Sequence, residues 1–131
     1  MKYACLVYMV EKDMNAMTKK ESDACIGESL AYDDALRKTG HFVAAQALQP
    51  VETATTIRVR GGKVSATDGP FAETKEQLGG FLLIDARDLN EAIQLATKIP
   101  MARYGTIEVR PVRDLRLQGG HHEVYVHDLS R

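Results

Sequence analysis

A small set of polar and aromatic side chains in this chain could bind or transform a small molecule. They are Ser29, His41, Arg58, Asp68, Phe71, Lys75 and Arg110. A carboxylate can accept a proton, guanidinium and ammonium groups bind anions, and histidine titrates near neutral pH. The chemistry that they suggest is the binding of a small polar or aromatic organic molecule, with proton transfer as the reaction. No pattern in the sequence suggests a bound cofactor, and we expect none.

Asp68 is the candidate catalytic acid or base. It opens the run DGPFAETKEQLGG, residues 68–80, in which Asp68, Gly69 and Pro70 are turn-forming residues with different backbone roles. A carboxylate in a turn beside a covered sheet face can be desolvated, which shifts its pKa. The alternative is that Asp68 accepts backbone hydrogen bonds and only anchors the turn. Both interpretations stay open on the sequence.

Arg58 and Arg110 are candidates for binding an anionic group. Each lies in an expected strand whose apolar residues alternate with charged ones, so both arginines are expected on the sheet face away from the helices. That face would line a cavity with Ser29 and Asp68, where the guanidinium groups bind a carboxylate in a bidentate way. The alternative is that the arginines form cross-strand ion pairs with Glu52 and Glu108.

Three further candidates are weaker. His41 follows the glycine that ends the first expected helix, where it complements the helix dipole or titrates beside a ligand. Lys75 belongs to a charged stretch with Glu73 and Glu76 that is typical of a solvated rim, although it is placed to reach a bound anion. Phe71 is the aromatic ligand contact expected in the same run.

Composition excludes several classes of function. Seventeen basic and eighteen acidic residues give a net charge of −1, so the basic field of a nucleic-acid-binding protein is missing. The apolar segment from Tyr3 to Val10 is far shorter than the roughly 20 residues of a membrane span, and no cleavage site follows it. We therefore expect a cytoplasmic protein with no membrane or nucleic-acid partner.

The potential metal ligands do not predict a metal site. Cys5 and Cys25 lack zinc-site spacing and are expected to be buried thiols. Near the end of the chain lie His121, His122 and His127, with Asp128. Adjacent residues in a strand point to opposite faces, so these histidines would not converge on one ion.

Capping and periodicity predict the elements that position the candidates in the first half. A strand is expected over Lys2–Val10, followed by a helix that starts at the capping box of Thr18 and Glu21 and stops at Gly40. Its inward stripe comprises Cys25, Ser29, Tyr32 and Leu36. Further strands are expected over His41–Leu48 and Thr55–Arg60, and Gly61 with Gly62 makes a hairpin into Lys63–Thr67.

The second half repeats the pattern of strand, helix and strand. Leu78–Asp85 is expected as a buried strand, with a bulge or close backbone approach at Gly79 and Gly80. Asp88 and Glu91 begin a second helix that ends before Pro100. Its expected inward residues are Leu89, Ala92, Ile93, Ala96 and Ile99. Thr106–Val112 is expected as the last strand.

This order predicts a ferredoxin-like α+β fold, with two helices on one sheet face and an inserted β-hairpin. The other sheet face is left open in one chain, so we expect a homodimer that buries it. The domain is expected over residues 1–113. Residues 114–131 form a tail that either adds a strand to the partner or is loose.

Three strings carry a family resemblance: PVETATTIRVR at 50–60, TDGPFAETKEQLGGF at 67–81 and GTIEVRPV at 105–112. Together they resemble the DGPF-type branch of the YCII-related family over about residues 1–113. The resemblance implies a dimeric ferredoxin-like α/β barrel. It implies no established activity, because most members have none, and it implies an association with sigma factors of the extracytoplasmic-function type.

In the wider family, a histidine on the first helix and an aspartate before the proline after the second helix form a proposed acid/base pair. The matching positions here are Ser29 and Ile99. Serine without an activating base and isoleucine cannot relay protons near neutral pH, so the mechanism should not transfer. The location should transfer, since Ser29 keeps its place in the inward stripe.

Two hypotheses follow. The first is a small-molecule-binding protein with isomerase-like or lyase-like proton transfer, in a cavity between the sheets of a dimer. The second is a non-catalytic regulatory or interaction module that engages a sigma factor, which the loss of the acid/base pair favours.

Overall fold

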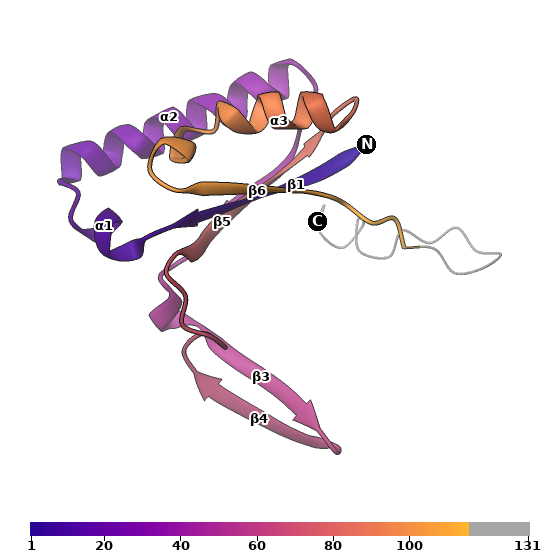
Figure 1. Cartoon of the computed structure of the whole chain (residues 1–131). Helices are drawn as coiled ribbons and strands as arrows, with labels where there is room; N and C mark the ends of the chain where they lie inside the picture. The colour runs from indigo at the N-terminus through magenta and orange to yellow at the C-terminus, as the bar shows by residue number, and fades with distance from the viewer. Residues whose placement is uncertain (116–131) are drawn as a thin grey trace.

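A four-stranded antiparallel sheet with two helices on one face forms the body of the protein in a computed structural model that describes residues 1–115 (Figure 1). The elements in chain order are β1 (Lys2–Met9), α1 (Glu11–Asn15), α2 (Lys19–Lys38), β2 (Phe42–Ala47), η1 (Val51–Thr53), β3 (Thr55–Arg60), β4 (Lys63–Asp68), β5 (Gln77–Asp85), α3 (Leu89–Thr97), η2 (Pro100–Arg103) and β6 (Thr106–Pro111). The strand order β2-β5-β1-β6 is that of a ferredoxin-like sheet, which confirms the predicted fold.

The start of α2 is fixed by the predicted capping box. The backbone N–H of Glu21 donates to the Thr18 hydroxyl at 3.1 Å, and the N–H of Thr18 donates to the Glu21 carboxylate at 3.1 Å. At the other end, Gly40 has φ +79°, a conformation that glycine adopts without strain. These two ends fix which residues form α2, and helical periodicity then places Ser29 on the side that faces the sheet.

The core lies between the sheet and the helices. Tyr3, Cys5 and Val7 of β1 are buried, and alternate residues of β5 join them. In α3, the inward residues are Ala92 and Ala96, followed by Ile99, as predicted. The prediction was wrong for Leu89 and Ile93, which are 49% and 46% exposed, because the helix is rotated so that Leu95 packs against the core instead.

The opposite sheet face has no cover within the described chain. Leu6 lies between Phe81 and Glu108 in the register, and Ala4 lies between Leu83 and Arg110. These apolar side chains are partly exposed. They form what we call the open face, the surface that was expected to be buried in a dimer.

The glycine pair of β5 has both predicted features. Val7 pairs with Gly80 and Tyr8 with Leu78, so Gly79 has no partner in β1 and forms a bulge. A Cβ atom on Gly80 would meet the main chain of β2, so the backbones of β2 and β5 come close together there. The bulge and the close approach shape the sheet beneath the middle of α2.

The hairpin β3–β4 forms as predicted, with positive φ at Gly61 and Gly62, but it is a separate two-stranded sheet. It projects away from the body on the side opposite to α2 and α3 (Figure 1). The expectation that Arg58 and Arg110 share one face of one sheet is therefore wrong. An insertion longer than a simple turn, between edge strand β2 and β5, leaves the sheet instead of extending it.

The short helix α1 was not predicted, and the predicted tail cannot be compared with the structure. Helix α1 has no side-chain cap, so no sequence signal predicted it. The tail was predicted over 114–131. Positions 116–131, which include His121, His122, His127 and Asp128, lie outside the described residues. In the part of the chain that the structure describes, no helix is long and apolar enough to cross a membrane.

Candidate functional site

A cavity of about 430 Å³ lies between α2 and the sheet. Its walls come from α1, α2, β1, β2 and β5, together with residues 99–101 and Met17 between α1 and α2. Its polar lining residues are Ser22, Cys25, Ser29, Tyr32, Asp33 and Gln46. This volume falls in the range of small-molecule pockets, which run from roughly 300 to 1,000 Å³.

The polar lining of α2 follows from helical periodicity. Ser22, Cys25, Ser29, Tyr32 and Asp33 recur at spacings of three and four, so they project from one face. Tyr32 also ties this face to the second helix, because its hydroxyl donates to the carbonyl of Leu95 at 2.6 Å. Burial raises the pKa of Tyr32, so it remains a neutral hydrogen-bond donor.

The apolar lining is rich in methionine. Four of the five methionines of the chain line the cavity, and they are Met9, Met14, Met17 and Met101. Methionine is flexible and polarisable, and its sulfur makes favourable contacts with aromatic rings. The cavity is thus suited to a flat apolar body whose outline is matched by side-chain adjustment.

Asp33 is the one charged side chain among the lining residues that the structure describes. Burial raises the pKa of its carboxyl, the neighbouring Asp34 adds to this rise, and Arg37 opposes it. The carboxylate of Asp34 forms an ion pair with Arg37 at 2.6 Å. Asp33 was not predicted from the sequence, although its spacing of four residues from Ser29 is a signal that could have revealed it.

Ser29 and Ile99 both line this cavity. They are the positions at which the resemblance placed the acid/base pair of the wider family. One wall holds Ser29 on α2, and Ile99 lies where the chain leaves α3, so two segments far apart in sequence meet at one site. Both positions thus line one cavity, and neither carries an ionisable side chain.

Cys25 adds a thiol to the cavity wall and, as predicted, is buried. A hydrogen bond with Cys25 raises the pKa of the Tyr104 hydroxyl. The guanidinium of Arg103 lies over the Tyr104 ring, 5.5 Å from the ring centre. Arg103 also forms an ion pair with Glu28 of α2. Arg103 is therefore neutralised by an acidic partner beside the cavity and does not project into it.

Three of the predicted residues lie in the hairpin or just after it, and they do not line the cavity. Arg58 and Phe71 line a shallow groove along β3. Asp68 is the exposed last residue of β4, and its side chain makes no hydrogen bond or ion pair with residues 1–115. The turn is held instead by the Gly69 N–H, which donates to Ala54, and by the Thr56 hydroxyl, which donates to Gly69, both at 2.8 Å.

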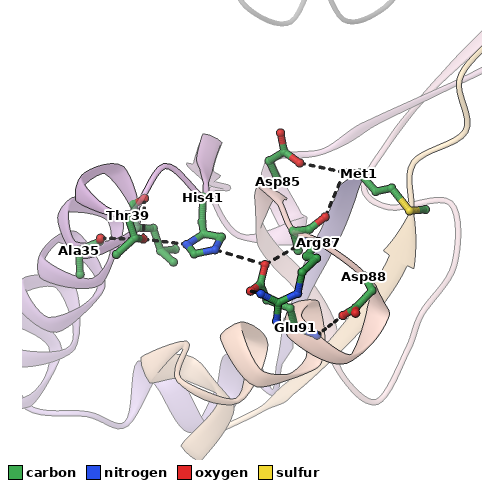
Figure 2. Close-up of polar contacts among 10 residues, drawn as sticks. Met1, Ala35, Thr39, His41, Asp85, Arg87, Asp88 and Glu91 are labelled. Atoms are coloured by element: carbon green, nitrogen blue, oxygen red, sulfur yellow. Dashed lines mark hydrogen bonds and ion pairs between the residues drawn. The ribbon is translucent and has the colours of Figure 1, made fainter.

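His41 lies in a polar network that joins the end of α2 to the start of α3 (Figure 2). Its Nδ1 is 2.8 Å from the Thr39 hydroxyl, and its Nε2 is 3.4 Å from the Glu91 carboxylate. The Arg87 N–H donates to the same carboxylate at 2.9 Å, and this bond is the main cause of the lowered pKa of Glu91. His41 therefore helps to connect α2 with α3, and it does not line the cavity.

The two remaining candidate residues, Lys75 and Arg110, also do not line the cavity. Lys75 is exposed in the loop before β5, beside Glu76, whose carboxylate accepts from the Thr106 hydroxyl at 2.9 Å. Arg110 lies on the open face opposite Ala4. Of the residues named from the sequence as ligand-binding or catalytic, the described chain thus brings only Ser29 into the cavity.

These features define a ferredoxin-like α+β domain with a cavity between its long helix and its sheet. The chain belongs to the YCII-related domain family, whose model matches residues 1–116. An uncharacterised protein, R00369 of Rhizobium meliloti (strain 1021), is 38% identical over 114 residues, which cover 86% of this chain and 92% of that protein.

A solved structure shares the fold. It is the 5-chloro-2-hydroxyhydroquinone dehydrochlorinase TftG of Burkholderia phenoliruptrix AC1100, in complex with 2,5-dihydroxybenzoquinone. The likeness has a TM-score of 0.52 and covers 92% of this chain and all of the other, at 12% sequence identity. At this identity the likeness establishes the fold alone.

Proposed function

We propose that this protein binds a small organic molecule with an aromatic or quinone-like ring in the cavity between α2 and the sheet. The observation that carries the proposal is that Ser29 and Ile99, the positions of the wider family's acid/base pair, line one cavity of about 430 Å³. The neighbour TftG, with the same fold, was solved with a small ring compound bound. The site proposed here lies between helix and sheet, and not between two sheets.

The reaction class that fits this cavity is proton transfer, of the isomerase or lyase type. Neither Ser29 nor Ile99 can exchange a proton near neutral pH. Asp33 is the carboxyl that faces the same space, and its raised pKa brings it closer to the range in which a general base is effective. A bound ring would lie among the methionines, with an acidic O–H or C–H group directed at Asp33.

A ligand titration followed by NMR tests the binding. Hydroquinone, added to the isotope-labelled protein, should shift the amide signals of Ser29, Gly80 and Met101. The variant Ser29→Phe fills the cavity and should abolish these shifts. Ser65→Phe places the same ring on the exposed hairpin and should leave them unchanged. Shifts that persist in Ser29→Phe, or that occur only on the hairpin, would refute the cavity as the site.

We also propose that two copies of the chain associate through their open faces. Leu6, Phe81 and Leu83 are covered by nothing in the described chain, and burying such a surface is favourable by about 25 cal/mol for each Å². Asp68 does not line the cavity of its own chain, so a catalytic role for it would need the hairpin of a second copy. Light scattering coupled to gel filtration measures the association.

A second candidate function is a non-catalytic module that binds another protein, such as an extracytoplasmic-function sigma factor. The hairpin favours it, because Ile57, Val59 and Val64 leave one face apolar and exposed while Arg58 and Arg60 lie on the other. Co-purification of a sigma factor that is lost on Ile57→Asp, with no response to hydroquinone, would select this function over the first.

We place either function in the cytoplasm. The support is that Cys5 and Cys25 are both free and buried in the structure, as suits a reducing compartment. Detection of the native protein in a periplasmic or secreted fraction would contradict this location.

A further inference from the structure

We propose that the cavity selects neutral or cationic aromatic molecules over anionic ones, and that Asp33 sets this selectivity. The inference rests on the proposed function, because it names the class of ligand for the same site. It also reverses the expectation, drawn from Arg58 and Arg110, that an anionic ligand is bound.

The first support is the charge of the lining. Within residues 1–115, Asp33 is the only lining side chain that carries a charge, and no lysine, arginine or histidine lines the cavity. The two nearby guanidinium groups are paired with acids outside it: Arg37 with Asp34, and Arg103 with Glu28. An anionic ligand would therefore meet one like charge and no compensating cation, in a space where apolar walls weaken solvent screening.

The second support is the hydrogen-bonding state of Asp33. Its side chain makes no hydrogen bond or ion pair with any residue that the structure describes, whereas the adjacent Asp34 is paired at 2.6 Å. Burial raises the pKa of Asp33, as expected of a carboxylate without a close donor. An ammonium or hydroxyl group on a ligand would supply that donor, and hydrogen bonds to an ionised acceptor are the stronger kind.

The third support is the apolar body of the site. The four methionines, with the exposed Ile26 and Leu30 of α2, give the cavity apolar walls that can contact a ring. The arrangement of a ring-binding wall with one acidic group at its edge suits an arylalkylamine, or a neutral phenol or alcohol. It leaves an aryl carboxylate without a partner.

Three probes of equal ring and chain length test the selectivity: 2-phenylethylamine, 2-phenylethanol and phenylacetate. They are cationic, neutral and anionic near neutral pH. Each is titrated into the full-length protein, and the Kd is taken from the amide shifts of Ser29 and Met101. We expect the amine to bind at least about tenfold more tightly than phenylacetate, with the alcohol between them. Added salt should reduce the difference between the Kd values of the amine and phenylacetate.

Two carboxylates of α2 provide a pair of variants. Asp33→Asn should abolish the preference for the amine, while Asp23→Asn, which removes an exposed ion pair with Lys19 and leaves Arg37 paired with Asp34, should keep it. Circular dichroism establishes that both variants fold. Since the order of the three probes is measured on the unmodified protein, the test stands even where Asp33→Asn fails to fold.

The outcomes separate the two proposals. Equal affinities, or a preference for phenylacetate, overturn the selectivity and leave the binding cavity intact; the second result would indicate a cation brought by another chain. A preference that survives Asp33→Asn overturns the role of Asp33. If hydroquinone and all three probes leave the lining signals unmoved, the proposed function fails, and the inference fails with it.

Discussion

A Cβ atom at Gly80 would lie 2.7 Å from the main-chain carbonyl oxygen of Gln46. Gly80 belongs to β5 and Gln46 to the neighbouring strand β2, and both line the cavity. The obstacle is backbone rather than the end of a flexible side chain, so the two strands would have to separate to admit a methyl group. The close approach is therefore a structural requirement for glycine at this position.

Gly80→Ala should destabilise the protein by about 1–3 kcal/mol, the usual cost of overpacking a well-filled interior. Chemical denaturation measures the change in the free energy of unfolding. Gly27→Ala is the control, because a Cβ there meets nothing within 4 Å. Since Gly27 lies inside α2, that variant should be more stable than the parent by about 0.5–1 kcal/mol. Equal effects of the two substitutions would contradict the close approach of the strands.

Glu91→Gln should weaken the protein at neutral pH and have less effect in acid. The pKa of Glu91 is lowered from its ordinary value of 4.5, first by the N–H of Arg87 and then by the charge of Arg87 and by His41. A carboxyl whose pKa is depressed in the folded state contributes stability above its unfolded pKa, and this contribution is lost as the pH falls through the folded pKa.

The measurement is the free energy of unfolding of parent and variant across the acid range. Their difference should be constant above the ordinary pKa of glutamate and should shrink below it. Glu73→Gln is the control, because Glu73 is exposed and makes no hydrogen bond or ion pair within residues 1–115. A Glu91→Gln deficit that is independent of pH would show that the ionised carboxylate is not what stabilises the connection between α2 and α3.

Ile84→Ala should destabilise the protein by about 2–5 kcal/mol, because Ile84 is fully buried in β5 between the sheet and the helices. Val64→Ala, on the hairpin, should change the stability of the single chain by no more than about 0.5 kcal/mol, since Val64 is 70% exposed. Thermal unfolding under conditions that keep the protein dilute measures both. A large loss for Val64→Ala would mean that the hairpin is covered in solution.

The substitution Leu83→Thr, on the open face, should weaken self-association without unfolding the protein. Threonine keeps a high strand propensity while it makes this part of the open face polar. Ile57→Thr makes a similar change on the separate hairpin and is the control. Gel filtration with light scattering, over a range of concentrations, should show more single chains for Leu83→Thr only. An unchanged mass for Leu83→Thr would exclude this position from the interface.

Most of the fold was predictable, because it depends on local signals. The capping box at Thr18, the side-chain cap at Asp88, the glycine turn at Gly61 and the bulge at Gly79 each act within a few residues, and each is present in the structure. The predictions that were wrong concern features determined by long-range packing. The rotation of α3 about its axis, which leaves Ile93 exposed, is set by the partner surfaces and not by the pattern of apolar residues.

The candidate site was less predictable for the same reason. Ser29 was found because helical periodicity places it in the inward stripe. The arginines were assigned to a shared face on the assumption that β3 joins the main sheet, and nothing local in Thr55–Arg60 shows that it does not. Asp33 was missed because two adjacent acids on a helix are typical of a solvated surface, and only the tertiary structure shows that one of them lines a cavity.

The strand order β2-β5-β1-β6 has a consequence for how the chain folds. No two neighbouring strands of the main sheet are consecutive in the sequence, so each pairing closes a long loop, and the entropy of that closure is lost before the contacts form. The hairpin β3–β4, closed by two glycines, needs no such step and can form within microseconds. Folding should therefore be slow for the size of the domain, with the pairing of β1 to β6, from opposite ends of the described chain, as a late event.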